Sequence, residues 1–434
     1  MKLWQKENTS VSEKIEKFTV GRDKEFDLLL AKHDVRGSIA HIKMLAHVGL
    51  MQADEAEAAI KGLETIAAEI EAGQFTIEEG IEDVHSQVEY LLTQRIGEAG
   101  KKIHSGRSRN DQVAVDIKLY LREEIINIKQ QVTELFDLLI AQSEKYKAVL
   151  LPGYTHLQIA MPSSFGLLFG AYAESLVDDL EVLAASYAVA NKNPLGSGAG
   201  YGSSFPLNRT LTTEFLEFST LNYNSVYAQM SRGKTEKIVA MGISSIASTL
   251  SKLSMDCCLY LNQNFGFITF PSHLTTGSSI MPHKKNPDVF ELIRAKCNRI
   301  QSTPNELLLL LNNLPSGYHL ELQLTKDILF PPIQELKGCI EMAVLMLSNI
   351  QVKDNILDDD KYLYLFSVEA VNNMVNQGIP FREAYQRVGN QIEKNTFDFD
   401  YTKGLNHTHE GSIGNLCNEA IQQQFQLVLQ KFGN

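Results

Sequence analysis

The feature that most constrains the fold is a helical pattern of apolar residues from Gln112 to about Tyr146, which no Pro or Gly interrupts. Apolar side chains recur there at spacings of three, four and seven residues, which predicts one long α-helix. Similar patterns predict long helices over residues 163–190, 234–262, 287–311 and 327–350. Such helices are longer than usual, and none can enclose a core alone. They should pack side by side, so the sequence predicts an all-α fold with a central helical bundle.

Prolines and loop composition divide the chain further. Pro304 predicts a kink or a break in the fourth of these helices, whereas Pro331 and Pro332 should lie in the first turns of the fifth. Shorter helices are expected before the bundle, and short helices with polar joints after it. We therefore predict three segments: an N-terminal helical domain (1–105), a central helical bundle (106–350) and a small C-terminal helical domain (351–434).

Some of these helices are apolar on more than one side, as in the stretch MDCCLYL from Met255 to Leu261. A helix of that kind should be buried on several faces. This occurs where bundles of different subunits associate, and also inside a large monomeric helical domain. From the helix patterning we favour the oligomer.

Composition limits the partners. The chain has 434 residues, enough for a large core, and a net charge of −12. A surface of that sign repels nucleic acid and anionic lipid, so neither is an expected partner. The five cysteines form no CxxC pair, and the start MKLWQKENTS lacks an apolar signal core. No run approaches the ~18 apolar residues of a membrane span. We therefore expect no metal site, no membrane and a reducing, cytoplasmic compartment.

The segment TTGSSIMPHKKNPD, Thr275 to Asp288, is a flexible cationic loop in an acidic protein. Asn286 is a good N-cap and Pro287 a good first helical residue, so a helix should begin there. The helix N-terminus and Lys284 would together attract an anion. Ser278 could act as a nucleophile or a base if a lysine and backbone N–H groups stabilise its alkoxide. The alternative is a capped helix after a solvated loop.

Two further loops hold candidate site residues. In HSGRSRNDQ, Arg109 presents a planar fork that suits a carboxylate, and Asn110 or Asp111 can cap the following helix. In GYTHLQ, His156 is a candidate acid or base because the pKa of histidine lies near neutrality, and Glu291 could orient it. Each loop also has a simpler interpretation, the first as a basic loop beside an N-cap and the second as the site of a structural histidine.

Together these loops offer Arg, Lys, Asn, Ser, Thr and His, without a metal-binding cluster or a nucleotide-binding glycine motif. The bound groups should therefore be carboxylates, and the chemistry should be proton transfer. Removing a proton next to a carboxylate requires a base, and cations to hold the charge that builds on the carboxylate oxygens. The pattern indicates an elimination that uses no cofactor.

The segment GSSIMPHKKNP, Gly277 to Pro287, resembles the signature GSSxMPxKxNP of the fumarase/aspartase superfamily of lyases. Within it, the segments SRNDQ, GYTHLQ, KKNPD, DVRGSIAHIKML and PFREAY resemble the argininosuccinate lyase family. The resemblance implies an all-helical protomer of three domains, a homotetramer with a core of central helices, and active sites built from loops of three subunits. It also implies the reaction, a reversible and cofactor-free conversion of argininosuccinate into arginine and fumarate.

The resemblance also implies residue roles. Ser278 resembles the base that removes a proton from the succinyl carbon, and Lys284 and Asn286 resemble the groups that hold the doubly charged carboxylate of the carbanion. His156, paired with Glu291, resembles the histidine that assists departure of the guanidinium group. The residues that resemble substrate-binding groups are Arg109, Asn110, Thr155, Tyr318, Gln323 and Lys326. The last three match the family's Tyr-x4-Gln-x2-Lys spacing, which points to the arginine end of the substrate.

The chain departs from the family at several positions. His283 stands where the family often has Gln, and Asp23 falls near the place of a substrate-binding serine. The segment QMSRGK, which contains Arg232, replaces a Ser-Asp-Arg-Asp segment of the family.

Three other functions compete with this interpretation. A sister lyase for another N-substituted aspartate is disfavoured by the Tyr-x4-Gln-x2-Lys spacing. A structural protein that only kept the fold is disfavoured by the intact set of reaction residues. A phosphate- or nucleotide-binding module is disfavoured because the P-loop motif is absent from the sequence and no parallel sheet is predicted.

Overall fold

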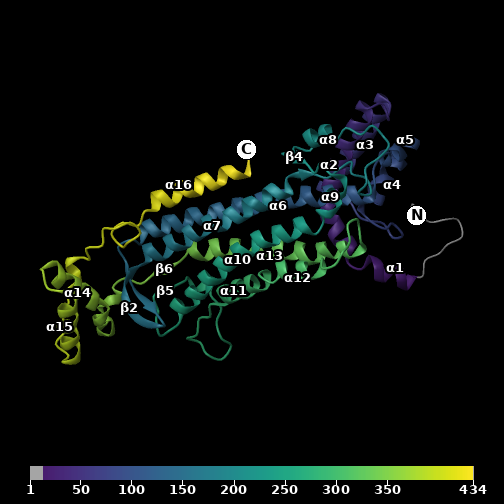
Figure 1. Ribbon diagram of the computed structural model, residues 1–434. Helices are drawn as coiled ribbons and strands as arrows, with labels where there is room; N and C mark the ends of the chain where they lie inside the picture. Colours follow the sequence, from purple (N-terminus) through teal and green to yellow (C-terminus); the bar gives the residue numbers. More distant parts are fainter. Residues whose placement is uncertain (1–12, 434) are drawn as a thin grey trace. The chain divides into compact units, whose positions relative to one another are not determined.

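The computed structural model describes residues 13–433, and most of them lie in α-helices (Figure 1). The predicted all-α fold is confirmed. The expectation about the segment MKLWQKENTS lies outside the described residues. Short strand pairs accompany the helices: β1 (Leu150–Thr155) with β2 (Gln158–Ser164) and β5 (Ile268–Thr269) with β6 (Gln351–Val352) are antiparallel, and β3 (Lys192–Asn193) with β4 (Thr220–Leu221) is parallel.

The chain divides into two compact units. Unit 1 comprises Met1–Ile128, Val182–Ser245 and Arg299–Leu336, and unit 2 comprises Lys129–Glu181, Ile246–Asn298 and Lys337–Asn434. The boundaries fall inside helices, namely α6 (Arg109–Lys145), α7 (Phe165–Ala190), α10 (Lys234–Leu261), α11 (Asp288–Ile300) and α13 (Leu324–Ser348). The division into segments 1–105, 106–350 and 351–434 stays a prediction.

Unit 1 has a core between α2 (Asp23–His47), α3 (Ala53–Glu71) and α4 (Val84–Ile96), where apolar residues such as Ile42 and Leu63 are fully buried. Helix α4 begins where the Asp83 carboxylate accepts the backbone N–H of Ser86, as a helix cap does. The other elements of this unit are α1 (Glu13–Val20), α5 (Glu98–Lys101), α8 (Arg209–Phe215), α9 (Ser225–Met230), α12 (Thr303–Leu310) and the 3₁₀ turns Lys102–His104 and Leu320–Gln323.

Unit 2 contains the hairpin β1–β2 and a helix pair, α14 (Ser367–Asn376) and α15 (Phe381–Glu393), which packs around Val371 and Ala384 (Figure 1). Helix α16 (Asn418–Leu429) stacks Phe425 on Phe136 of α6, with ring centroids 3.7 Å apart. The remaining elements are the 3₁₀ turns Ser272–Leu274, Ile356–Asp358, Asp360–Phe366, Tyr401–Lys403 and Gln430–Phe432.

Helix α6 confirms the longest predicted helix, with 37 residues. The predicted cap is wrong, because the helix already begins at Arg109. Ser108 Oγ accepts the N–H of Asn110 at 3.3 Å, and the Asp111 carboxylate accepts the N–H of Ser108 at 2.8 Å. Ser108 therefore caps α6, and Asp111 supports it from inside the first turn.

Other helix boundaries correct the predictions in part. The chain leaves the helical conformation between α11 and α12, so the break predicted from Pro304 is confirmed. Helix α13 starts at Leu324, before the predicted residue 327, and its prolines therefore lie inside the helix rather than in its first turns. Helix α2 has 25 residues, longer than the short helices expected in the first segment. The predicted loop GYTHLQ is the turn of the hairpin β1–β2.

Helix α10 is long and apolar enough to cross a membrane by length and composition, although the sequence was not expected to contain such a stretch. In the structure, 56% of its most apolar window is buried inside the protein. That burial is typical of a core helix, and it agrees with the bundle predicted for this part of the chain.

Candidate active site

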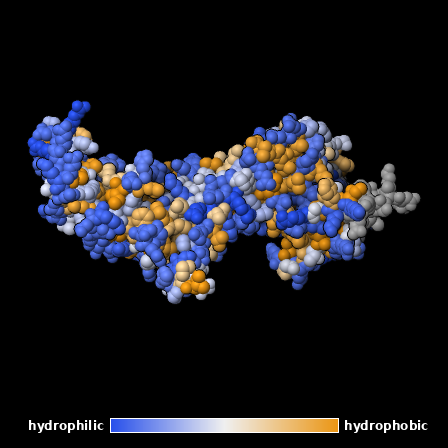
Figure 2. Space-filling model, turned by 90° about the horizontal axis from the view of Figure 1, so that it is seen from below, coloured by the Kyte–Doolittle hydropathy of each residue, from blue (hydrophilic) through white to orange (hydrophobic). Residues whose placement is uncertain are grey.

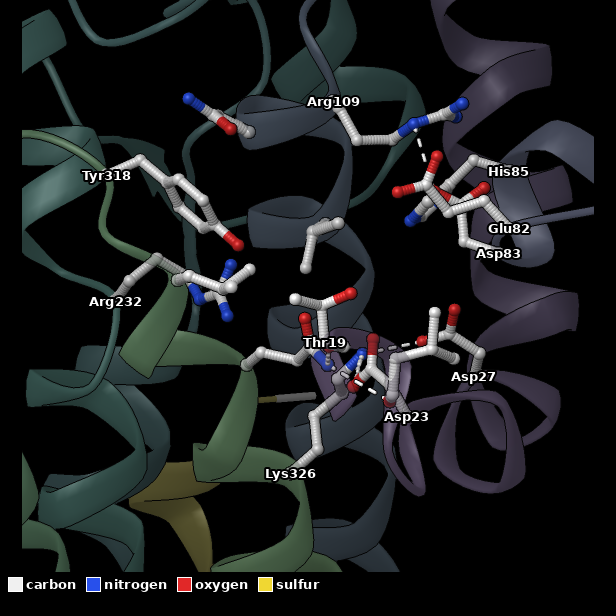
Figure 3. A pocket seen from close by; sticks show the side chains of 15 residues that line it. Thr19, Asp23, Asp27, Glu82, Asp83, His85, Arg109, Arg232, Tyr318 and Lys326 are labelled. Carbon is white, nitrogen blue, oxygen red and sulfur yellow. Dashed lines mark hydrogen bonds and ion pairs between the residues drawn. The ribbon is translucent and has the colours of Figure 1, made fainter. Parts of the chain in front are cut away.

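A polar pocket of about 270 Å³ lies in unit 1, where segments far apart in the sequence meet (Figure 3). Its walls come from the end of α1, the start of α2, the start of α4, the start of α6, the turn before α10 and the segment that leads into α13. The charged residues that line it are Asp23, Asp27, Glu82, Asp83, His85, Arg109, Arg232 and Lys326. The predicted residues Asn110, Tyr318 and Gln323 line it as well.

The floor of the pocket is an ion triad. The Lys326 ammonium points between two carboxylates, 2.7 Å from Asp23 Oδ1 and 2.6 Å from Asp27 Oδ1 (Figure 3). Asp23 and Asp27 are four residues apart on α2 and so share one helix face. Burial alone would lower the pKa of Lys326, but the two carboxylates outweigh it and raise that pKa. Burial also raises the pKa of Asp23 to about 6, against the opposing charge of Lys326.

Arg109 lies on another wall and is held by three neighbours. Its Nε lies 3.2 Å from Asp83 Oδ2, and its guanidinium donates to Ser86 Oγ at 2.9 Å and to Gln112 Oε1 at 3.4 Å. Burial would raise the pKa of Asp83, but the charges of His85 and Arg109 and the bonds from Ser86 lower it. The Arg109 fork is thus fixed in place before any ligand binds.

Arg232 and Tyr318 line the pocket on the side opposite Asp83 and His85 (Figure 3). The Arg232 side chain is 3% exposed, its Nε lies 3.3 Å from Glu236 Oε1, and its Nη2 donates to the Leu322 carbonyl at 3.2 Å. Its Nη1 is buried, and the residues that the structure describes provide no hydrogen-bond partner for it. Because a buried guanidinium N–H without an acceptor is costly, this atom is suited to bind an anion.

Gln323 also makes structural contacts that the sequence did not predict. Its amide nitrogen donates to the backbone carbonyls of Thr19 at 3.0 Å and Val20 at 3.2 Å. These bonds hold the segment before α2 against the segment before α13. Gln323 therefore shapes the pocket wall, in addition to the substrate contact that the sequence predicts.

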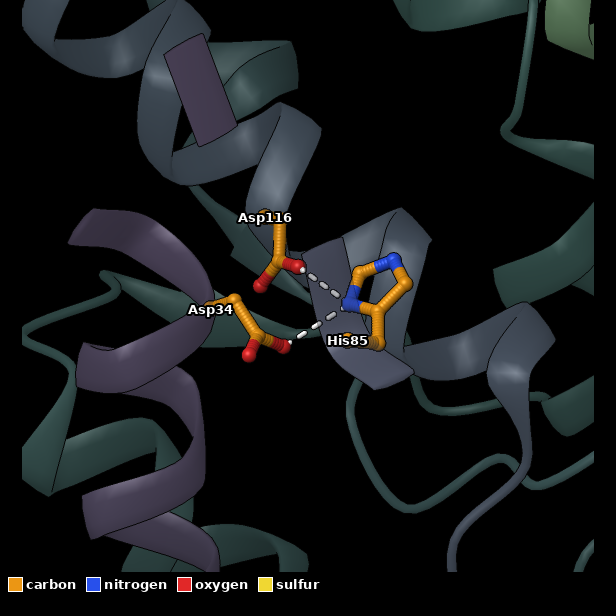
Figure 4. A group of neighbouring side chains, drawn as sticks. All are labelled: Asp34, His85 and Asp116. Carbon is orange, nitrogen blue, oxygen red and sulfur yellow. Dashed lines mark hydrogen bonds and ion pairs between the residues drawn. The ribbon is translucent and has the colours of Figure 1, made fainter. Parts of the chain in front are cut away.

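Behind the pocket lies a buried cluster that the sequence did not reveal, made of Asp34, His85 and Asp116 (Figure 4). His85 Nδ1 lies 2.8 Å from Asp34 Oδ1 and 3.4 Å from Asp116 Oδ2. Burial and the Asp34 charge raise the pKa of Asp116 well above its usual range. For Asp34, burial acts the same way, but the His85 charge and hydrogen bond outweigh it and lower the pKa.

This cluster has the residue types and the spacing of a metal site. One possible ligand atom from each residue lies within 4.8 Å of the other two. The separation of His85 Nδ1 and Asp34 Oδ1 is, however, that of a charge-assisted hydrogen bond. Gln112 also donates to Asp34 at 2.6 Å. We therefore interpret the cluster as a proton-sharing group that orients His85, whose ring borders the pocket.

The residues predicted to carry the reaction belong to unit 2, and none of them lines this pocket. Ser278 lies in the loop before α11, and its Oγ accepts the backbone N–H groups of Ile280 at 3.3 Å and Met281 at 3.2 Å. Such donors favour a negatively charged oxygen. Lys284 is exposed, and within residues 13–433 its ammonium makes no ion pair.

The predicted cap of α11 is wrong. The helix begins at Asp288, and the Asn286 side chain donates to Thr276 Oγ1 at 3.4 Å and to the Gly277 carbonyl at 3.3 Å instead of capping it. Thr276 and Asn286 also pair through their backbones. These contacts close the loop 276–286 at its base and leave its tip, with Ser278 and Lys284, on the surface.

Thr155 and His156 lie at the tip of the hairpin β1–β2, and both are exposed. His156 and Leu157 have positive φ angles of 54° and 59°, as the central residues of a tight hairpin turn do. Glu291 is exposed on α11. In the described part of the chain no hydrogen bond joins His156 to Glu291, so a single chain does not form the predicted pair.

The structure thus brings one half of the predicted site together. The pocket contains Arg109, Asn110, Tyr318, Gln323 and Lys326. It does not contain Thr155 or the predicted reaction residues Ser278, His156, Lys284, Glu291 and Asn286. Sequence reasoning missed Asp27, Asp83 and His85. The four-residue spacing of Asp23 and Asp27, and a cap at Asp83, were the available signals.

Comparison with known proteins identifies the family of the chain. Residues 8–302 match the protein family described as Lyase. The argininosuccinate lyase of Bacteroides thetaiotaomicron is 59% identical over 431 residues, 99% of this chain and 96% of that protein. The argininosuccinate lyase of Methylococcus capsulatus is 42% identical over 379 residues, 87% of this chain and 81% of that protein.

Solved structures support the fold. EDDS lyase in complex with formate superposes with a TM-score of 0.75 at 20% identity, covering 98% of this chain and 91% of that one. The class II fumarase of Schistosoma mansoni gives a TM-score of 0.69 at 16% identity, covering 86% and 88%. With curated relatives that are similar along nearly its whole length, the chain belongs to the argininosuccinate lyase family.

Proposed function

We propose that this protein catalyses the reversible elimination of argininosuccinate to arginine and fumarate. The observation that carries the proposal is 59% identity to an argininosuccinate lyase over 99% of the chain. The polar pocket of unit 1 supports it, because opposed carboxylates and guanidinium groups suit a substrate that carries both charges. The reaction forms a carbon–carbon double bond and releases a protonated guanidinium, so its steps are proton transfers and breaking of a carbon–nitrogen bond.

In the proposed mechanism Ser278 is the base that removes a proton from the succinyl carbon. A serine hydroxyl can do this only if its alkoxide is stabilised. The backbone N–H groups of Ile280 and Met281, which point at its Oγ, and the cationic loop around Lys284 supply that stabilisation. Lys284 and Asn286 would then hold the carboxylate on which charge builds after the proton leaves.

His156 is proposed to assist departure of the guanidinium group, oriented by Glu291. Both side chains are exposed on one chain and not bonded to each other, so the proposed pair requires loops of different subunits. Thr155, next to His156, would contribute to substrate binding. Arg109, Asn110, Tyr318, Gln323 and Lys326 would bind the rest of the substrate in the pocket of unit 1.

We further propose a homotetramer with active sites shared between subunits. Large apolar side chains are exposed on α7, α10, α11, α12 and α13, and hydrophobic patches appear on one face of the molecule (Figure 2). Leu292 is 59% exposed and Leu309 62% exposed. Further examples are Val182, Met241, Met255, Leu308 and Leu345. Contiguous exposed apolar patches are typical of subunit interfaces. We also propose a cytoplasmic location, a role in arginine biosynthesis and a reaction without a cofactor.

The experiment is to follow fumarate formation by its ultraviolet absorbance, with argininosuccinate as sole substrate and no added metal or cofactor. We expect fumarate and arginine in equal amounts. A folded protein that releases fumarate only from other N-substituted aspartates would be a sister lyase. A folded protein that is inactive on the whole panel would be a structural scaffold, and either result would overturn the proposal.

A further inference from the structure

We infer that Asp23 is a specificity-determining residue, which binds the α-ammonium of the amino-acid end of the substrate. The inference rests on the proposed function and deepens it, because it states which chemical group selects the leaving half of the molecule. Asp23 lies in the first turn of α2 and lines the pocket of unit 1.

Within the ion triad, Asp23 is the member most exposed to a ligand in the pocket. Its side chain is 19% exposed, whereas Lys326 is 4% and Asp27 is 3% exposed. When all three are ionised, one ammonium faces two carboxylates, so the triad carries one net negative charge. A net negative charge at the floor of a half-buried pocket attracts a cation and repels an anion more strongly than it would in water.

The opposite charge is available across the pocket. Arg232 lines the same pocket, and its buried Nη1 has no hydrogen-bond partner among residues 13–433. Arg232 lies near enough to act on the titration of both Asp23 and Tyr318. A ligand with an ammonium and a carboxylate on one carbon atom would satisfy Asp23 and Arg232 together. A ligand with only carboxylates would satisfy Arg232 and leave Asp23 facing an anion.

The alternative role for Asp23 is to hold Lys326 in place. Asp27 already makes the same contact, at 2.6 Å and from a buried position one helical turn away. Lys326 therefore keeps a carboxylate partner when Asp23 is replaced. The two roles predict different effects on binding affinity. If Asp23 only positions Lys326, its replacement should weaken every ligand alike. If Asp23 binds the ammonium, its replacement should weaken only ligands that carry the ammonium.

The test compares arginine with deaminoarginine, in which hydrogen replaces the α-ammonium. Binding of each ligand to the full-length protein is measured by titration calorimetry for the wild type, Asp23→Asn and Asp23→Ser. The matched control is Glu25→Gln, in the same turn of α2, whose carboxylate pairs with Arg22 at 3.1 Å on the surface. Melting temperatures verify that each variant is folded.

We expect the wild type and Glu25→Gln to prefer arginine by about tenfold or more. Both Asp23 variants should lose most of that preference and bind deaminoarginine at least as well as the wild type does. Equal weakening of both ligands, an unchanged preference, or a wild type that does not distinguish them would overturn the inference. Fumarate release by the wild type is measured in parallel. Its absence would count against the proposed function, whereas an active wild type with an unchanged preference in Asp23→Asn would defeat only this inference.

Discussion

The pocket of unit 1 and the loop 275–287 of unit 2 both carry a predicted site lysine, in opposite surroundings. Lys326 is 4% exposed and held by two carboxylates within 2.7 Å. Lys284 is exposed at a loop tip, and the described residues provide no ion pair for it. The Lys326 charge in the pocket is paired inside one chain, whereas the Lys284 charge on the loop is free to bind an anion or another subunit.

This difference separates two ways of building a site. In the pocket, the groups that would recognise the substrate also stabilise the fold, because removing one leaves a buried charge without a partner. On the loop, the groups that would carry out the reaction contribute little to stability, because water already solvates them. Substitutions should therefore affect stability and activity together in the pocket and affect only activity on the loop.

The strongest test of the loop is Ser278→Ala. Loss of a general base lowers turnover by about 10² to 10⁴-fold. Because Ser278 lies on an exposed loop, we expect an unchanged melting temperature and an unchanged oligomeric state. Steady-state fumarate formation and a thermal melt measure both quantities. Ser279→Ala, at the exposed neighbouring hydroxyl, is the control and should retain most activity. Comparable losses in the two variants would contradict the assignment of the base.

The strongest test of the pocket is Lys326→Met, which leaves Asp23 and Asp27 facing each other without a cation. Breaking a buried ion pair on one side costs about 3–5 kcal/mol of unfolding free energy. We expect a large loss of stability together with weaker arginine binding, measured by denaturant unfolding and calorimetry. Lys61→Met, at an exposed lysine of α3, should change neither. A Lys326→Met protein as stable as the wild type would contradict the claim that substitutions in the pocket affect stability and activity together.

Much of this arrangement was predictable from local sequence. The long helices follow from apolar spacing, and the break before α12 follows from Pro304. The spacing of Tyr318, Gln323 and Lys326 places three residues together because they lie on one segment that enters α13. Local pattern was less useful at helix ends. Ser108 was overlooked as a cap because Asn110 and Asp111 are cap-forming residues too, and only the hydrogen bonds decide between them.

The rest of the site depends on contacts between distant segments. Asp27 and Lys326 are 299 residues apart in sequence, and nothing in either segment alone indicates that they pair. The cluster of Asp34, His85 and Asp116 likewise joins three helices. The hairpin turn at His156 was missed because two consecutive positive φ angles occur there without Gly or Asn. The predicted pair of His156 and Glu291 stays a prediction, because no hydrogen bond joins the two side chains within residues 13–433.

Inside the buried half, Asp34→Asn and Asp116→Asn should have unequal effects. The pKa of Asp116 is raised, so ionising it in the folded state costs free energy, and its contribution to stability falls as pH rises through that pKa. Asparagine cannot ionise, so Asp116→Asn should be near neutral or stabilising at alkaline pH. The pKa of Asp34 is lowered, so its carboxylate contributes stability above its unfolded pKa and loses it in acid. Asp34→Asn should cost about 1.5–3 kcal/mol, because His85 loses its charged acceptor.

Denaturant unfolding of both variants as a function of pH measures this difference. If both variants lose the same unfolding free energy, Asp34 and Asp116 do not differ in protonation. That result would contradict our interpretation, in which Asp116 holds the proton and Asp34 carries the charge.

The smallest expected effect is on the pH dependence of kcat/KM. Burial raises the pKa of Asp23 to about 6, with Asp27 adding to the shift and Lys326 and Arg232 opposing it. If the Asp23 carboxylate binds the substrate ammonium, kcat/KM should fall by roughly tenfold per pH unit below that pKa. This acid limb should disappear in Asp23→Asn and persist in Glu25→Gln, when initial rates are measured across pH. An acid limb that remains in Asp23→Asn would assign it to another group and contradict the prediction. If the acid limb disappears in Asp23→Asn, the Asp23 carboxylate of the pocket sets it. That result is expected if the pocket recognises the substrate and the loop carries out the reaction.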